Sequence, residues 1–67
     1  MKCSYILYKN KIQLFINKHK DRILNVEKTY INIQGKEHVI RLYWDGMVKV
    51  QDKKIGKFNE GMVEQYL

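Results

Sequence analysis

The 67-residue sequence contains no proline, a single cysteine and no apolar run of the length needed to cross a membrane. Because Cys3 is alone, an intramolecular disulfide is impossible and a cysteine-based zinc site is disfavoured. Lys9 and Lys11 interrupt the apolar residues near the N-terminus, well short of a signal-peptide core. We therefore expect a reducing, cytoplasmic location and no membrane partner.

Residue types that carry catalysis or bind metals are few and poorly spaced. His19 and His38 are the only histidines, and neither has a cysteine or carboxylate at a spacing typical of metal ligands. Nucleophilic catalysis would require a base beside Cys3 or Ser4, and we expect both residues to lie in a frayed segment at the start of the chain. The glycines are too dispersed to form a phosphate-binding loop. We therefore expect a protein that is not an enzyme, with no catalytic residues, no metal and no cofactor.

Positive charge is what the chain has in excess. Thirteen Lys and Arg residues and seven Asp and Glu residues give a formal net charge of +6, and residues 1–34 carry seven of the basic and two of the acidic groups. Neutralising phosphates releases counterions and steers association, so this excess favours a polyanionic partner. Eleven of the thirteen are lysine, as low-GC coding would also produce, so charge alone does not identify the partner.

From residue 29 onward the hydrophobic pattern has a period of two, which predicts β-strands. With 45% hydrophobic residues and no low-complexity tract, we expect one small globular domain over residues 1–67. In "TYINIQGKEHVIRLYW", Gly35 and Lys36 can form a two-residue hairpin loop. That loop predicts the cross-strand pairs Ile33 with His38, Ile31 with Ile40, and Tyr30 with Arg41.

The next turn, in "YWDGMV", allows two registers, which the hydrophobic pattern distinguishes. A two-residue loop of Asp45 and Gly46 would mix polar and apolar residues on both faces of the sheet. A type I turn at Trp44 and Asp45, followed by Gly46 in the left-handed conformation, separates them. This turn predicts the pairs Tyr43 with Met47, Leu42 with Val48, and Ile40 with Val50. The predicted core face is then Ile31, Ile33, Ile40, Leu42, Val48 and Val50.

The C-terminal part is predicted to add a strand and a helix. The strand "KKIGKF" follows a turn at Asp52 and Lys53. Asn59 is a favourable helix N-cap, and Glu60 places a negative charge in the first turn. The helix should lie on the sheet as a lid, through a face formed by Met62, Val63, Tyr66 and Leu67.

The N-terminal part has two interpretations. A turn at Lys9 and Asn10 predicts a hairpin whose apolar face has the pairs Leu7 with Ile12, Tyr5 with Leu14, and Cys3 with Ile16. The alternative is a helix, because five residues of this part recur at helical spacing: Ile12, Phe15, Ile16, His19 and Ile23. We expect the hairpin, because its pairing explains the apolar residues on both sides of the turn. Whether residues 11–24 form a strand or a helix is left open.

The expected fold is mainly β within the α+β class. It is a small, bent antiparallel sheet or partial barrel of five to six strands with a short C-terminal helix. Residues 17–22 are predicted to form a basic loop. A change of phase between Val26 and Ile31 predicts a bulge near Glu27 and Lys28.

The predicted outer face of the sheet combines tyrosines with basic residues. Its cross-strand rows are Lys28, Tyr43 and Met47; Tyr30, Arg41 and Lys49; and Asn32, Val39 and Gln51. Aromatic rings among cations are typical of single-stranded nucleic-acid binders, since bases stack on rings while Lys and Arg contact phosphates. Arg41 opposite Lys49 is unfavourable unless an anion binds them. A second mode is a three-stranded sheet laid in the major groove of duplex DNA, with a helix behind it. We therefore expect a DNA- or RNA-binding site formed by Lys28, Tyr30, Arg41, Tyr43 and Lys49, with further phosphate contacts from Lys18, Lys20 and Arg22.

Trp44 supports an alternative function. An exposed tryptophan at a turn tip can anchor a protein interface. The chain would then be a protein-binding module or inhibitor that docks on an acidic protein through Trp44 and the tyrosine face. Trp44 can equally fold back over Met47 and Met62 as part of the core. An unpaired edge strand would also allow self-association into a homo-oligomer.

Overall fold

The computed structural model describes the backbone of residues 2–67 and the side chains from residue 7 onward. The elements are helix α1 (Lys2–Lys18), the 3-10 helix η1 (Lys20–Arg22), strands β1 (Ile23–Val26), β2 (Tyr30–Gln34), β3 (Val39–Tyr43), β4 (Met47–Val50) and β5 (Lys53–Lys57), and helix α2 (Glu60–Glu64). All neighbouring strands are antiparallel and follow chain order, and the sheet is not closed. The predicted fold class is confirmed: a mostly β, five-stranded antiparallel sheet with a short C-terminal helix.

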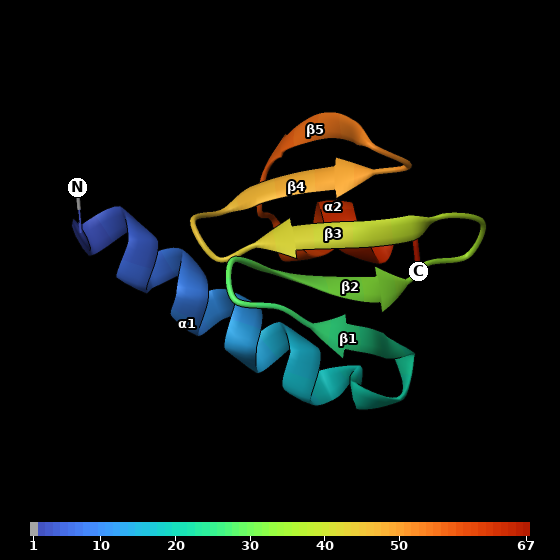
Figure 1. The fold of residues 1–67 in the computed structure, drawn as a ribbon, viewed down its shortest axis with the longest axis horizontal. Coiled ribbons are helices and arrows are strands. Elements are labelled where there is room, and N and C mark those ends of the chain that lie inside the picture. Colours follow the sequence, from blue (N-terminus) through green and yellow to red (C-terminus); the bar gives the residue numbers. More distant parts are fainter. Residues whose placement is uncertain (1) are drawn as a thin grey trace.

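Both helices pack on the same face of the sheet. Figure 1 looks onto the opposite, uncovered face, with α2 behind β3 and β4. The predicted core face is confirmed, because each of its residues is at most 7% exposed: Ile31, Ile33, Ile40, Leu42, Val48 and Val50. Ile12, Phe15 and Ile16 of α1 and Val63 of α2 belong to the same buried cluster. The core is therefore one layer between the sheet and the two helices.

The predicted N-terminal hairpin is wrong, because residues 2–18 form one helix. Lys9 and Asn10 lie inside this helix and make no turn. Phe15 is 1% exposed, whereas Leu14, which the hairpin placed inside, is 65% exposed. The segment contains neither glycine nor proline, so nothing in it interrupts a helix. The basic loop predicted after it is likewise replaced by the last turn of α1 and by η1.

The β2–β3 hairpin has the predicted faces but not the predicted register. Tyr30 pairs with Tyr43 rather than with Arg41, because the loop contains four residues instead of two, and the other two predicted pairs shift equally. Since the register moves by an even number of residues, every side chain stays on its face. In the longer loop the Lys36 N–H donates to the main-chain oxygen of Tyr66. That contact involves the distant C-terminal segment, so the local turn sequence does not reveal it.

The β3–β4 turn has the predicted conformation. Gly46 has φ +107°, and its N–H donates to the Tyr43 carbonyl oxygen at 2.9 Å, as expected for a type I turn followed by a left-handed glycine. The structure forms both aliphatic pairs predicted beside it, Leu42 with Val48 and Ile40 with Val50. The β4–β5 turn differs from the prediction, because it lies at Gln51 and Asp52, both with positive φ, rather than at Asp52 and Lys53.

Strand β1 contains the expected bulge at a different place. Its register against β2 shifts between Ile23 and Asn25, not near Glu27 and Lys28. Glu27 instead belongs to the β1–β2 connection, where its N–H donates to the Tyr30 carbonyl oxygen at 2.8 Å. Lys28 therefore lies in this connection, outside the strands.

Helix α2 forms the predicted lid. The Asn59 Oδ1 accepts a hydrogen bond from the Met62 N–H at 3.2 Å, which confirms the predicted N-cap. Val63 is fully buried, and Met62 and Leu67 pack against the core. Tyr66, expected on the same face, lies at the surface and is 37% exposed.

The helix and the hairpin predict opposite effects for two neighbouring substitutions. Phe15→Ala should lower the free energy of unfolding by about 3–5 kcal/mol, because removing a buried aromatic ring leaves a cavity. Leu14→Ala should change it by less than about 0.5 kcal/mol. Urea denaturation followed by circular dichroism measures both values. A larger loss for Leu14→Ala than for Phe15→Ala would contradict the helix.

Candidate nucleic-acid interface

The face of the sheet that no helix covers, named here the open face, carries tyrosine, asparagine and basic side chains. Its residues alternate along β2, β3 and β4 with the buried aliphatic ones, as the pleat of a strand requires. The central five are half-buried: Tyr30, Asn32, Arg41, Tyr43 and Lys49. Lys54 of β5 pairs with Lys49 and extends the open face toward the edge of the sheet.

Each tyrosine of the open face has a cation beside its ring. Tyr30 and Tyr43 are cross-strand partners, with ring centroids 5.4 Å apart and ring planes tilted by 56°. The Arg41 Cζ lies 4.2 Å from the Tyr30 ring centroid, and the Lys49 Nζ lies 5.6 Å from that of Tyr43, both within the range of cation–π attraction. The row predicted to contain Lys28 contains Tyr30 instead, because Lys28 lies outside the strands.

A chain of side-chain hydrogen bonds holds Arg41 in place. The Arg41 Nε donates to the Asn32 Oδ1 at 3.1 Å, and the Asn32 Nδ2 donates to the Asn25 Oδ1 at 2.9 Å. The Asn25 Nδ2 then donates to the Glu27 Oε2 at 2.7 Å. A side-chain hydrogen bond with Tyr43 raises the pKa of Arg41 above its ordinary value. An arginine side chain is always charged in proteins, and since it has five N–H donors, further donors remain for an anion.

Three cations stand in one row across β3, β4 and β5. Arg41 pairs with Lys49, as predicted, and Lys49 in turn pairs with Lys54. Sequence reasoning missed Lys54, because a register shift against β5 between Val48 and Lys49 decides that pairing. Like charges directly opposite one another on a sheet are destabilising. An anion bound over the row would relieve this repulsion.

A hollow of about 450 Å³ adjoins this row. Its lining combines open-face residues with residues of the two adjoining turns. Asn32, Arg41 and Lys49 supply hydrogen-bond donors, and Glu37 and Asp52 supply acceptors. Such a mixed lining suits the edge of an unpaired base, which carries donors and acceptors together.

Three of the predicted phosphate contacts lie away from the open face. The Lys18 Nζ forms an ion pair with the Glu60 Oε2 at 3.0 Å, on the side of the helices. The Arg22 Nη1 donates to the main-chain oxygen of Leu67 at 2.8 Å. Lys20 is exposed in η1, between α1 and the edge strand β1. The structure therefore does not gather these three residues with the tyrosines.

Trp44, expected to be partly exposed at a turn tip, is buried. Its side chain is 7% exposed and belongs to the core cluster, which agrees with the alternative in which it folds inward. The Trp44 Nε1 donates to the Glu27 carbonyl oxygen at 3.4 Å, and its main-chain N–H donates to the Thr29 carbonyl oxygen at 3.1 Å. These bonds join the β3–β4 turn to the β1–β2 connection and turn the ring inward. Trp44 therefore offers no projecting side chain by which a partner protein could be bound.

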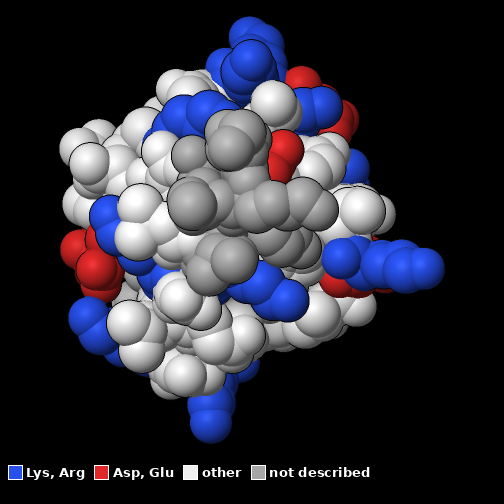
Figure 2. Space-filling model, turned by 90° about the vertical axis from the view of Figure 1, so that its left-hand side faces the viewer, with Lys and Arg blue, Asp and Glu red and all other residues white. Residues whose placement is uncertain are grey.

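Basic side chains are not confined to the open face. Figure 2 shows the molecule from the left-hand side of Figure 1, where Lys and Arg side chains project in several directions with acidic side chains among them. Net charge therefore supports attraction to polyanions in general. A nucleic-acid site must therefore be argued from the arrangement of rings and cations on the open face and not from the net charge.

Nothing in the described part of the chain points to a metal site or a membrane span. Among these residues, no group of three or more His, Cys, Asp or Glu side chains could hold a metal ion, and neither helix has the length and apolarity to cross a bilayer. Comparisons with protein-family models, curated proteins and solved structures found no match to this chain. Its function must therefore be argued from the site itself.

Trp44 is the only tryptophan, so tryptophan fluorescence, excited at a wavelength that the five tyrosines do not absorb, reports on this turn alone. We expect the folded protein to emit at shorter wavelength than the protein in guanidinium chloride and to be quenched far less by acrylamide, because the indole ring lies in the core. The denatured protein is the internal control. Equal quenching in the two states would show that Trp44 is exposed and would restore it as a candidate anchor.

Proposed function

We propose that this protein binds single-stranded DNA or RNA on the open face, without catalysis. Tyr30 and Tyr43 stack on bases, and Arg41, Lys49 and Lys54 contact phosphates. The observation that carries the proposal is the combination of a cross-strand tyrosine pair with a row of three cations on a face that no helix covers. A cytoplasmic location is part of the proposal and rests on the single cysteine of the sequence.

The tyrosine pair suits unpaired bases. Both rings are half-buried on the sheet, so they are already ordered and lose little side-chain entropy when a ligand binds. The Tyr43 ring can offer a face to a base when Lys49 moves to a phosphate, and one such stack contributes about 1–3 kcal/mol. In a duplex the bases are stacked on one another, so a single strand is preferred.

The cation row sets the expected salt dependence. Three phosphate contacts on a single strand predict that log affinity falls with log salt concentration with a slope of about −2. The net charge of +6 adds long-range attraction to the whole molecule. Lys18 and Arg22 lie away from the open face, so they contribute to this general attraction rather than to the site.

Fluorescence anisotropy with labelled single-stranded DNA, single-stranded RNA and duplex DNA tests the proposal. We expect single strands to bind more tightly than the duplex. The double variant Arg41→Ala/Lys49→Ala should weaken binding at low salt at least about tenfold and make the slope shallower by about 1.4. The matched control is Lys9→Ala/Lys11→Ala, which removes the same charge from α1 on the covered side and should leave the slope nearly unchanged.

Tyrosine substitutions separate stacking from charge. Tyr43→Ala should weaken binding by about 1–3 kcal/mol without changing the salt slope. Tyr66→Ala, at the exposed C-terminal end, is the control and should have little effect, with circular dichroism confirming that each variant is folded. The proposal would be contradicted if Arg41→Ala/Lys49→Ala and Lys9→Ala/Lys11→Ala lowered the affinity equally. It would also be contradicted if the protein bound none of the three nucleic acids at low salt.

A further inference from the structure

A second surface, on the side of the helices, is built differently from the open face. Leu7 and Leu14 of α1 are 53% and 65% exposed, although they are large apolar side chains. Lys11 and Lys18, also exposed, alternate with them at spacings of four, three and four residues. This spacing places all four residues on one side of a helix. We name these four residues the α1 stripe.

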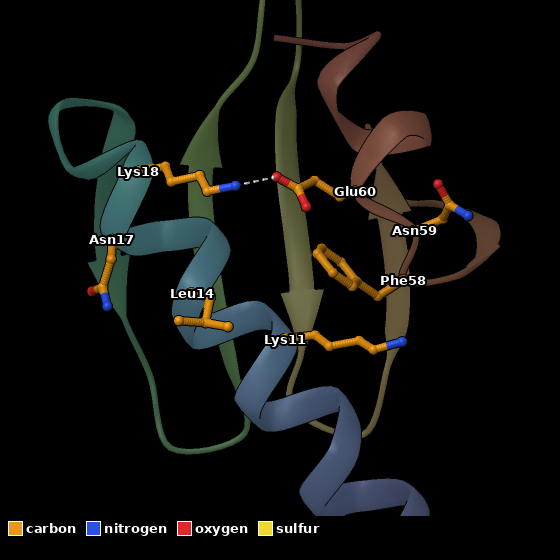
Figure 3. A pocket seen from close by; sticks show the side chains of 7 residues that line it. All are labelled: Lys11, Leu14, Asn17, Lys18, Phe58, Asn59 and Glu60. Atoms are coloured by element: carbon orange, nitrogen blue, oxygen red, sulfur yellow. Dashed lines mark hydrogen bonds and ion pairs between the residues drawn. The ribbon is translucent and has the colours of Figure 1, made fainter.

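The α1 stripe borders a groove of about 560 Å³ between α1 and the segment that joins β5 to α2. Figure 3 shows the groove, with Leu14 and Lys18 on α1 and with Phe58 pointing toward the helix from the other wall. The Lys11 side chain reaches across toward the same wall in this view. The Lys18–Glu60 ion pair spans the groove at 3.0 Å. The groove thus combines the apolar side chains of Leu14 and Phe58 with two lysines and one carboxylate, Glu60.

We propose that the groove and the α1 stripe bind an acidic amphipathic helix of a partner protein. The apolar side chains of that helix contact Leu7 and Leu14, and its carboxylates pair with Lys11 and Lys18. A helix that docks in a groove presents anchors at spacings such as i and i+7, so a helix lying along α1 can place one anchor beside each of the two leucines, which are also seven residues apart. This site does not depend on the nucleic-acid proposal, because it lies on the helical side of the molecule, opposite the open face.

Shape and charge favour a helix over other ligands of a basic, apolar surface. From residue 7 to residue 18 the stripe is about 16 Å long, so the ligand is elongated rather than a small molecule. A flat lipid surface could contact Leu7 and Leu14 but would leave the concave groove beside them unfilled. A nucleic-acid strand would leave Leu7 and Leu14 in contact with water. A second copy of the chain, itself with a net charge of +6, would set lysines against lysines.

The Lys18–Glu60 ion pair does not oppose docking. Its side chains are 63% and 43% exposed, and ion pairs this exposed contribute little to stability. A partner carboxylate can therefore bind Lys18 with little loss elsewhere. Glu60 remains in a favourable place, since it lies in the first turn of α2.

A model peptide tests this proposal. The probe is a fluorescein-labelled helix of about three heptads with leucine at positions a and d and glutamate at positions e and g. The comparison peptide has lysine in place of glutamate. Anisotropy titrations should show that the full-length protein binds the acidic peptide and not the basic one, because Lys11 and Lys18 attract carboxylates and repel lysines.

Two matched variants locate the binding. Leu14→Glu should weaken binding of the acidic peptide at least about tenfold, since it replaces a central apolar contact by a like charge. Gln13→Glu adds the same charge one residue away, at an exposed position outside the groove, and should change the affinity less than about twofold. Both positions are exposed, and circular dichroism with thermal unfolding checks that both variants fold.

Loss of binding in Leu14→Glu together with its retention in Gln13→Glu supports the site. Failure of the acidic peptide to bind, equal binding of the two peptides, or equal effects of the two variants overturns it. Vesicles containing anionic lipid are the further comparison. Association with vesicles that is tighter than with the peptide and is lost in Leu14→Glu would overturn the proposal by identifying a membrane surface as the ligand.

Discussion

Burial of one face of the sheet is the constraint on which this structure depends. A domain of this size buries only about 60% of the surface that its unfolded chain exposes, and the two helices available to cover the sheet both pack on one side. Helix α1 also covers the β3–β4 turn, where a Cβ on Gly46 would lie 2.7 Å from the Tyr8 Cδ2. Both helices are thereby used to cover one face of the sheet. The other face is exposed to water, and its side chains are therefore mainly polar.

The open face shows how such a polar surface is ordered without a covering layer. Arg41 lies on the Tyr30 ring and is tied through Asn32 to the neighbouring strand. The same contacts that order the side chains also keep Arg41 beside Lys49, where the two charges repel. The groove along α1 differs, because exposed leucines alternate there with lysines along the helix. The two faces therefore suit ligands of different chemistry.

Local patterns were sufficient to predict the buried and exposed faces of β2, β3 and β4. Alternation of apolar residues acts within each strand, so Ile31 and Val48 point inward whatever the exact pairing. The β3–β4 turn was predicted because Gly46 supplies the left-handed conformation that this turn needs. The start of α2 was predicted because the Asn59 side chain caps an N–H only three residues away. Each of these features depends on residues that are close in the sequence.

Features that depend on distant residues required the tertiary structure. Both interpretations of the N-terminal segment bury Ile12 and Ile16, and only the packing of Phe15 against the sheet selects the helix. The length of the β2–β3 loop is coupled to a contact with the C-terminal segment, and a bulge decides that Lys54 joins the cation row. The sequence by itself thus determined which face of the sheet is apolar and where its tyrosines and cations lie along the strands. Only the tertiary structure decided which of them are neighbours, because register, helix packing and the burial of Trp44 depend on contacts between segments far apart in the chain.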